Sequence, residues 1–158
     1  FGWWYGNSNE ITTGGGWYHL AATYDRASSN NDPLLYVNGV SQTVTQRNGP
    51  TGTVASDAAE SVFIGSDNGT ADFDGQIEDA RIFNRALSAA EIAVLAGGYR
   101  GALGGEVLWT QLHGPDGNLT TGTANVFDMS GNANHGTPQN GSSYVASYAP
   151  RLGRFKVG

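Results

Sequence analysis

The sequence predicts an all-β fold of short antiparallel strands with one short helix near residues 88–96. The chain has 24 glycines and only 14% charged residues in 158, a composition typical of many short strands joined by tight turns. Side chains alternate between two sets over 17–24 and again over 76–83, which is the period of a strand. Asn38-Gly39 lies between two β-branched or aromatic runs and favours a hairpin turn with positive φ at both positions.

The expected strands follow one another along most of the chain, after an aromatic stretch at residues 1–5. They are placed at 17–24, 34–37, 40–44, 61–65, 76–83 and 106–113. Polar residues predict loops at 26–33 and 47–53, and the last 45 residues are rich in turn-forming residues.

The helix has both of its end signals. Ser88 is an N-cap and Glu91 follows three residues later, which together form a capping box. Ile92 and Leu95 give the helix an apolar face, and Gly97-Gly98 end it. We therefore expect a two-turn helix that follows a strand.

Charge and composition exclude several classes of partner. The formal net charge is −6, so an acidic surface repels nucleic acid and anionic membranes. No apolar run approaches the ~20 residues that span a bilayer, and no cysteine is present. Low charge with many Asn, Thr, Ser and Gly favours an extracellular, cell-surface or virion-surface protein. Because the sequence begins at Phe1, we expect a processed or truncated start.

Five motifs resemble, in order, the laminin-G-like domains of the concanavalin-A-like lectin/glucanase superfamily. They are GGWYHLAATYD (15–25), LLYVNGV (34–40), FIGSD (63–67) and, within 73–92, the FDGQIED strand and the NRALSAAEI turn and helix. The resemblance implies a β-sandwich, or jelly roll, of two antiparallel sheets. The short helix normally closes such a domain after its last large strand.

The tail is in an unusual order. LWTQLHGPDGN and VFDMSGNANHGT, within 108–137, resemble the start of such a domain, and the middle strands of the family pattern are not recognisable. We therefore divide the chain into 1–105, a domain end, and 106–158, a domain start. The chain could span parts of two tandem domains, be permuted, or use its tail to complete its own or a neighbour's sandwich by strand addition. Completion of its own sandwich is favoured, because the family often has its first strand beside its last.

Oxygen ligands on loops indicate a possible Ca²⁺ site. An acidic stretch occupies 67–79, and the DMSGN motif adds a second candidate set; an alternative is that the DMSGN side chains only form a turn. The candidate calcium ligands are Asp72, Asp74, Asp79, Asp128 and Asn132.

Catalysis is not expected. Glycosidases on this scaffold pair carboxylates in an E-x-D-x-x-E arrangement, which is absent. Glu78 and Asp79 are adjacent, so on a strand they point to opposite faces. No Ser or Cys nucleophile signature occurs. A glycoside hydrolase remains the least favoured alternative, and Glu78 or Glu106 facing a second carboxylate would revive it.

Two binding functions remain open. Trp3, Tyr5 and Tyr99 could stack on a sugar ring in a calcium-dependent lectin, although sandwich cores also use large aromatics. The basic tail residues Arg151, Arg154 and Lys156 could meet the acidic loop of another copy, or be a solvated terminus. We favour a non-catalytic module for structural assembly or adhesion, through self-association or another surface protein, over glycan binding.

Overall fold

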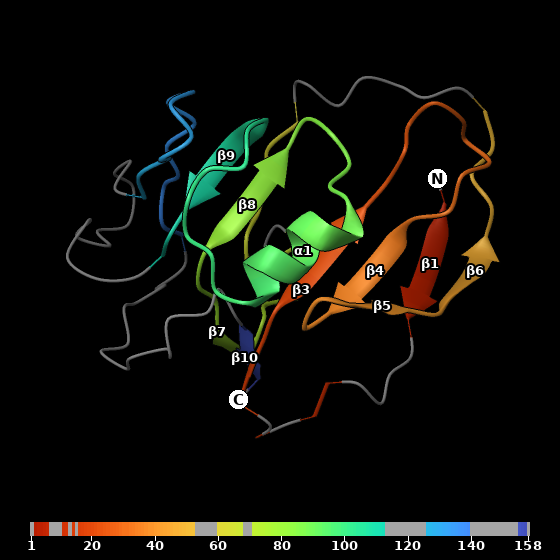
Figure 1. The fold of residues 1–158 in the computed structure, drawn as a ribbon, viewed down its shortest axis with the longest axis horizontal. Helices are drawn as coiled ribbons and strands as arrows, with labels where there is room; N and C mark the ends of the chain where they lie inside the picture. The colour runs from red at the N-terminus through yellow and green to blue at the C-terminus, as the bar shows by residue number, and fades with distance from the viewer. Residues whose placement is uncertain are drawn as a thin grey trace.

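In the part of the chain that the structure describes, the fold is built mostly of antiparallel strands with one short helix, which confirms the predicted β-sandwich class (Figure 1). The computed structural model describes residues 2–6, 11–12, 14, 16–52, 60–67, 71–112 and 126–139, and the backbone of 155–157. Within these residues the strands form four small sheets that do not close on themselves.

The four sheets draw on distant parts of the chain. One pairs β1 with β6, one orders β2, β10 and β7, one orders β3, β4 and β5, and one pairs β8 with β9. The strand bounds are β1 Trp3–Gly6, β2 Trp17–Tyr18, β3 Leu20–Thr23, β4 Leu34–Val37, β5 Val40–Gln42, β6 Val44–Asn48, β7 Gly75–Gln76, β8 Ala80–Phe83, β9 Glu106–Thr110 and β10 Phe155–Val157. All described pairs are antiparallel.

The predicted hairpin is confirmed. Asn38 and Gly39 have φ values of 51° and 81°, the left-handed conformation that both central turn positions require. Gly39 also lies against the helix, because a Cβ built there would be 3.0 Å from the Cβ of Ala96. A side chain at this turn would therefore push β4 and β5 away from the helix.

The predicted strand 17–24 divides at His19. The His19 N–H donates to Asn38 Oδ1 at 3.0 Å, and the Asn38 N–H donates to the His19 carbonyl at 2.8 Å. These bonds fix the end of the β4–β5 hairpin at the point of division. As a result β2 pairs with β10 and β3 pairs with β4.

The predicted strand 76–83 is also interrupted, by Asp79 at φ 55°. Residues 77–79 belong to no strand, so the expectation that Glu78 and Asp79 point to opposite sheet faces is wrong. Glu78 is buried, and the side chain of Asp79 is only 6% exposed. The predicted strand 61–65 does not form either.

The helix α1, Ala89–Ala96, is the predicted one. Its capping box is complete, since Ser88 Oγ accepts from the Glu91 N–H and Glu91 accepts from the Ser88 N–H. Arg85 binds Glu91 with both terminal nitrogens and, with Ser88, lowers the pKa of Glu91 to about 2. The helix start is thereby fixed to the chain that leaves β8.

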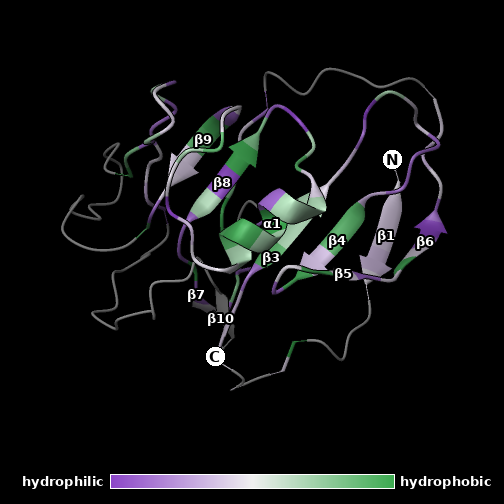
Figure 2. Ribbon diagram, viewed as in Figure 1, coloured by the Kyte–Doolittle hydropathy of each residue, from purple (hydrophilic) through white to green (hydrophobic). Residues whose placement is uncertain are grey.

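The core is a small apolar cluster beneath α1. Buried residues from β4 and the helix region pack with partly buried residues of β3, β8 and the chain before β9; they are Tyr36, Leu87, Ile92 and Leu95 with Ala21, Phe83 and Leu103. Figure 2 shows that β3, β4, β8 and α1 are mainly hydrophobic, whereas β6 is hydrophilic. The helix thus covers one face of the β3–β4–β5 sheet.

Two strands of the tail lie in sheets of the same chain. β9 pairs with β8, and β10 lies between β2 and β7. The division of the chain at residue 105 stays a prediction. Arg151 and Arg154 are outside the described residues, and only the backbone of Lys156 is described.

Candidate functional site

The β1–β6 ribbon has two chemically different faces. Trp4 pairs with Gln46 and Tyr5 with Thr45, and a bulge between Trp3 and Trp4 leaves Arg47 as an extra residue on β6. Because strand side chains alternate, Trp4 points to one face while Trp3 and Tyr5 point to the other.

The inner face holds Trp4 in place. Its indole N–H donates to Asp32 Oδ1 at 2.6 Å, and the side chain of Gln46 donates to the same oxygen at 3.3 Å. The Trp4 ring lies 6.2 Å from the ring of Tyr24. It also lies over Gly2, where a Cβ would come within 2.0 Å of the indole. A glycine is therefore required at position 2 for this packing.

The outer face exposes aromatic surface. Trp3 is 57% exposed and Tyr5 is 52% exposed. The Arg47 guanidinium carbon lies 4.9 Å from the centre of the Trp3 ring, a cation–π contact that favours one ring orientation. We call Trp3, Tyr5, Thr45 and Arg47 the aromatic face. It offers two rings, with the hydrogen-bond donors of Thr45 and Arg47 beside them, on one side of a ribbon.

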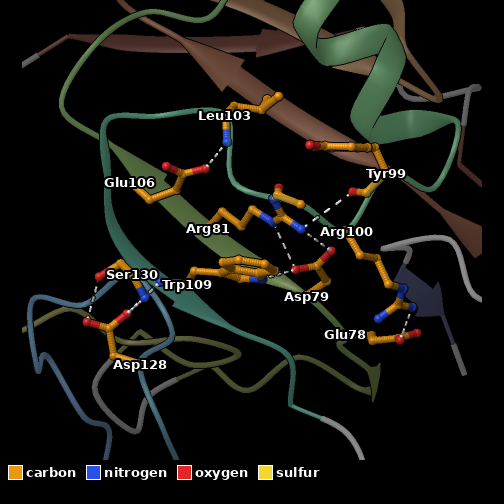
Figure 3. A network of polar contacts seen from close by, with 11 residues as sticks. Glu78, Asp79, Arg81, Tyr99, Arg100, Leu103, Glu106, Trp109, Asp128 and Ser130 are labelled. Carbon is orange, nitrogen blue, oxygen red and sulfur yellow. Dashed lines mark hydrogen bonds and ion pairs between the residues drawn. The ribbon is translucent and has the colours of Figure 1, made fainter.

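Tyr99 is not part of the aromatic face. It is 45% exposed, but it follows α1 and lies beside the Arg81 side chain (Figure 3). Its ring covers Gly101, where a Cβ would come within 2.2 Å of the Tyr99 hydroxyl. Of the three predicted sugar-binding aromatics, the structure therefore brings Trp3 and Tyr5 together and leaves Tyr99 elsewhere.

A second polar site surrounds Trp109 on β9 (Figure 3). Arg81 binds Asp79 with two nitrogens, at 2.9 Å and 3.1 Å, and the Trp109 indole N–H donates to Asp79 Oδ1 at 2.7 Å. The Arg81 guanidinium carbon lies 4.1 Å from the centre of the Trp109 ring. The side chains of Arg81 and Asp79 are only 5% and 6% exposed. We call Asp79, Arg81, Trp109 and Asp128 the Trp109 clamp.

Asp128 joins the loop at 126–136 to β9. Its carboxylate accepts from the N–H groups of Trp109, Ser130 and Asn134 and from the Ser130 hydroxyl, at 2.7–3.0 Å. Burial raises the pKa of Asp128, but these hydrogen bonds outweigh it and lower the pKa to about 2. Asn132 and Asn134 donate to carbonyls of β9. The DMSGN side chains thus act as turn formers and tie the loop to the strand.

The five predicted calcium ligands are dispersed. Asp79 and Asp128 lie on opposite sides of Trp109, Asp72 forms a bridge with Ser66, Asp74 precedes β7, and Asn132 donates to Ser130 Oγ. No group of three or more His, Cys, Asp or Glu that could hold a metal ion occurs in the part of the chain that the structure describes. The calcium site stays a prediction.

The carboxylates considered for glycoside hydrolysis have other partners. Glu78 forms an ion pair with Arg100, and Glu106 Oε1 accepts from the Leu103 N–H at 2.5 Å. Asp79 is bound by Arg81 and Trp109. Each carboxylate therefore stabilises the chain around β8 and β9.

Sequence reasoning missed the partners of both sites. Arg47 and Asp32 lie in the predicted polar loops at 47–53 and 26–33, and no motif marks Arg81. Arg81 follows Asp79 by two residues in the sequence, a local signal that could have indicated their ion pair. No local signal links Arg47 to Trp3, because the contact depends on the pairing of β1 with β6.

The family model described as concanavalin A-like lectin/glucanases superfamily matches residues 1–93. The chain belongs to this superfamily. The predicted laminin-G-like resemblance is thereby confirmed for the larger part of the chain. No curated protein and no solved structure matches the chain.

Domains of the laminin-G-like type in this superfamily are typically extracellular. No helix within the described residues is long and apolar enough to cross a membrane.

Proposed function

We propose that this superfamily member is a non-catalytic adhesion module of an extracellular or virion surface, and that it binds a glycan through the aromatic face. The observation that carries the proposal is the exposure of Trp3 and Tyr5, more than half exposed, on the same side of β1. Exposed aromatic pairs cost hydration free energy, so their position on the surface favours a binding role.

The chemistry of the face fits a sugar ring. The face of an indole or phenol ring carries negative potential, which attracts the C–H groups of a pyranose. The Thr45 hydroxyl and the Arg47 guanidinium can donate to sugar oxygens beside the rings. Trp4, which is held from the inner face, keeps the strand in register beneath them.

The test is binding of the intact chain to an array of glycans, followed by affinity measurements on any glycan that binds. Trp3→Ala and Tyr5→Ala are each expected to weaken binding at least tenfold, in the range of hot-spot side chains. Tyr99→Ala is a matched control, because Tyr99 is similarly exposed but lies off the aromatic face. Equal losses in all three variants, or no glycan bound, would contradict the proposal.

Calcium dependence separates this proposal from the lectin alternative predicted from the sequence. The aromatic face has no carboxylate, so binding should persist in EDTA. Loss of binding in EDTA would support the calcium-dependent lectin instead and would place the site at loop carboxylates.

A second candidate function is structural assembly by exchange of the C-terminal strand. β10 pairs on both of its edges, with β2 and with β7, so the β10 of a second copy in the same position would join two chains through two strand pairs. Removing residues 143–158 would leave both partners open. If intact chains form a large assembly and truncated chains remain folded monomers, the tail is the assembly element.

A further inference from the structure

Two strand edges face one cavity in this molecule. Residues 20–23 of β3 and 80–83 of β8 line a cavity of about 740 Å³, together with Ile92 and Leu95 of α1. Among the described strands, β3 pairs only with β4 and β8 pairs only with β9. We call this space the β3–β8 slot. Unpaired strand edges at such a space are templates for an added strand.

The directions of the two strands fit one inserted strand. β3 and β8 point the same way, while β4 and β9 point the opposite way (Figure 1). A strand between them would therefore be antiparallel to both, and it would join β9, β8, β3, β4 and β5 into one sheet. An extended residue fills roughly 160 Å³ at normal strand rise and sheet spacings, so a cavity of about 740 Å³ is large enough for a short strand.

The residues that line the β3–β8 slot indicate which side chains an inserted strand should have. Toward the helix, Ala21 and Phe83 belong to the apolar cluster. Charged side chains next to β3 and β8, among them the ion pair of the Trp109 clamp, also line the cavity. On the other face Leu20 and Ile82 are 39% and 37% exposed. A strand with apolar side chains on both faces would cover both sets of residues.

One segment of this chain has that pattern. Val62, Phe63 and Ile64 are consecutive, so they supply apolar side chains to both faces of an extended strand. They are 64%, 47% and 41% exposed. The sequence predicts a strand here, but the described structure includes these residues in none. The predicted strand 61–65 is long enough to pair with the four residues of β3 and of β8.

The segment does not occupy the slot of its own chain. It is absent from the residues that line the cavity. Its end is held elsewhere, because the Gly65 carbonyl accepts from the Phe73 N–H at 2.8 Å and a Cβ at Gly65 would be 3.1 Å from Ile77. With the bond between Gly65 and Phe73 intact, the segment remains available to the slot of another molecule.

We propose that two copies of this chain exchange segment 61–64, each placing it between β3 and β8 of the other. Such an exchange is reciprocal, so it closes as a two-fold dimer. Each of the two inserted segments would pair with both β3 and β8 of the other copy. The main-chain bonds would give affinity, and the apolar walls would select the side chains. This inference is independent of glycan binding.

The test is the mass of the intact chain by analytical ultracentrifugation at tens of micromolar, with three variants. Phe63→Asp puts a charge on the donated strand, and Leu20→Lys puts one on the wall of the slot. Both are expected to halve the mass from dimer to monomer. Val40→Asp is the matched control and should keep the dimer, because Val40 is 64% exposed and does not line the cavity.

Mixing the two monomeric variants tests the pairing itself. The Phe63→Asp chain retains an intact slot and the Leu20→Lys chain retains an intact segment, so an equimolar mixture should form dimers with one exchanged strand. Circular dichroism checks that both variants fold, and Ile82→Lys replaces Leu20→Lys if that variant does not.

Hydrogen exchange locates the interface. Amides of β3 and β8 should exchange more slowly in the parent chain than in Phe63→Asp. A monomeric parent chain would overturn the proposal. So would a dimer that survives both Phe63→Asp and a folded slot variant, or a dimer whose β3 and β8 amides are no better protected than in the monomer.

Discussion

Among the residues that the structure describes, two arginines lie over tryptophan rings, and the two pairs differ in almost every other respect. Arg81 lies 4.1 Å from the Trp109 ring, and the Arg81 side chain and Trp109 are 5% and 7% exposed. Arg47 lies 4.9 Å from the Trp3 ring, which is 57% exposed. The buried pair has a carboxylate partner in Asp79, whereas the residues of the aromatic face include no acid.

The difference separates a structural site from a candidate binding site. In the Trp109 clamp the aromatic N–H, the guanidinium and the carboxylate are bound to one another, so little of their chemistry remains for a ligand. On the aromatic face the rings are exposed and the hydrogen-bond donors face solvent. The same residue types therefore stabilise the fold in one place and can recognise a partner in the other.

The largest expected effect comes from breaking the clamp. Asp79→Asn keeps the side-chain shape but leaves the buried Arg81 cation without a carboxylate, which should reduce the free energy of unfolding by ~3–5 kcal/mol. Urea denaturation measures the change. Adding Arg81→Met should recover part of the loss, because it removes the uncompensated charge. A loss below ~1 kcal/mol for Asp79→Asn would show that the clamp contributes no more to the free energy of unfolding than an exposed ion pair does.

Acid should weaken the clamp through Asp128. Its pKa is about 2 in the folded chain, below the usual ~3.9 of an unfolded aspartate. The folded state therefore gains stability from the ionised carboxylate above about pH 4 and loses it as the pH falls through 2. We expect a contribution of ~2 kcal/mol at pH 7, of which about 1 kcal/mol is lost by pH 3.

Urea denaturation at pH 7 and at pH 3 checks this expectation. In Asp128→Asn the acid-dependent part that comes from this residue should disappear, so the variant should lose less stability between the two pH values than the parent. An identical pH dependence in both chains would show that the hydrogen bonds to Asp128 do not depend on its charge.

The smallest effect is expected on the aromatic face. Arg47→Ala should change the free energy of unfolding by less than ~1 kcal/mol, because an exposed cation–π contact is weak. Removing the arginine should nevertheless alter the tryptophan fluorescence, since the indole of Trp3 loses its neighbouring charge. A destabilisation as large as that of Asp79→Asn would remove the distinction between the two pairs.

Local signals in the sequence predicted a substantial part of the fold. Ser88 and Glu91 define the start of α1, and Asn38-Gly39 defines the β4–β5 hairpin, because both features depend on bonds within a few residues.

Other predictions failed where tertiary contacts compete with local pattern. Two predicted strands, 17–24 and 76–83, are each divided, at His19 by bonds to Asn38 and at Asp79 by its left-handed backbone. The predicted strand at 61–65 is not formed in the chain. Alternation of side chains indicates a strand, but it does not indicate which partner pairs with each part of it.

The sequence by itself determined the fold class, the helix and the central hairpin, because these depend on short-range hydrogen bonds and side-chain periodicity. It also determined the family, through motifs that occur in the family's order. Only the tertiary structure decided that Asp79 and Asp128 hold Trp109, that Arg47 covers Trp3, and that β3 and β8 face one cavity. These contacts join residues that lie far apart along the chain or on different strands. They arise only when the strands pack, since the energy that orders them comes from burial and from bonds that no local segment can form alone.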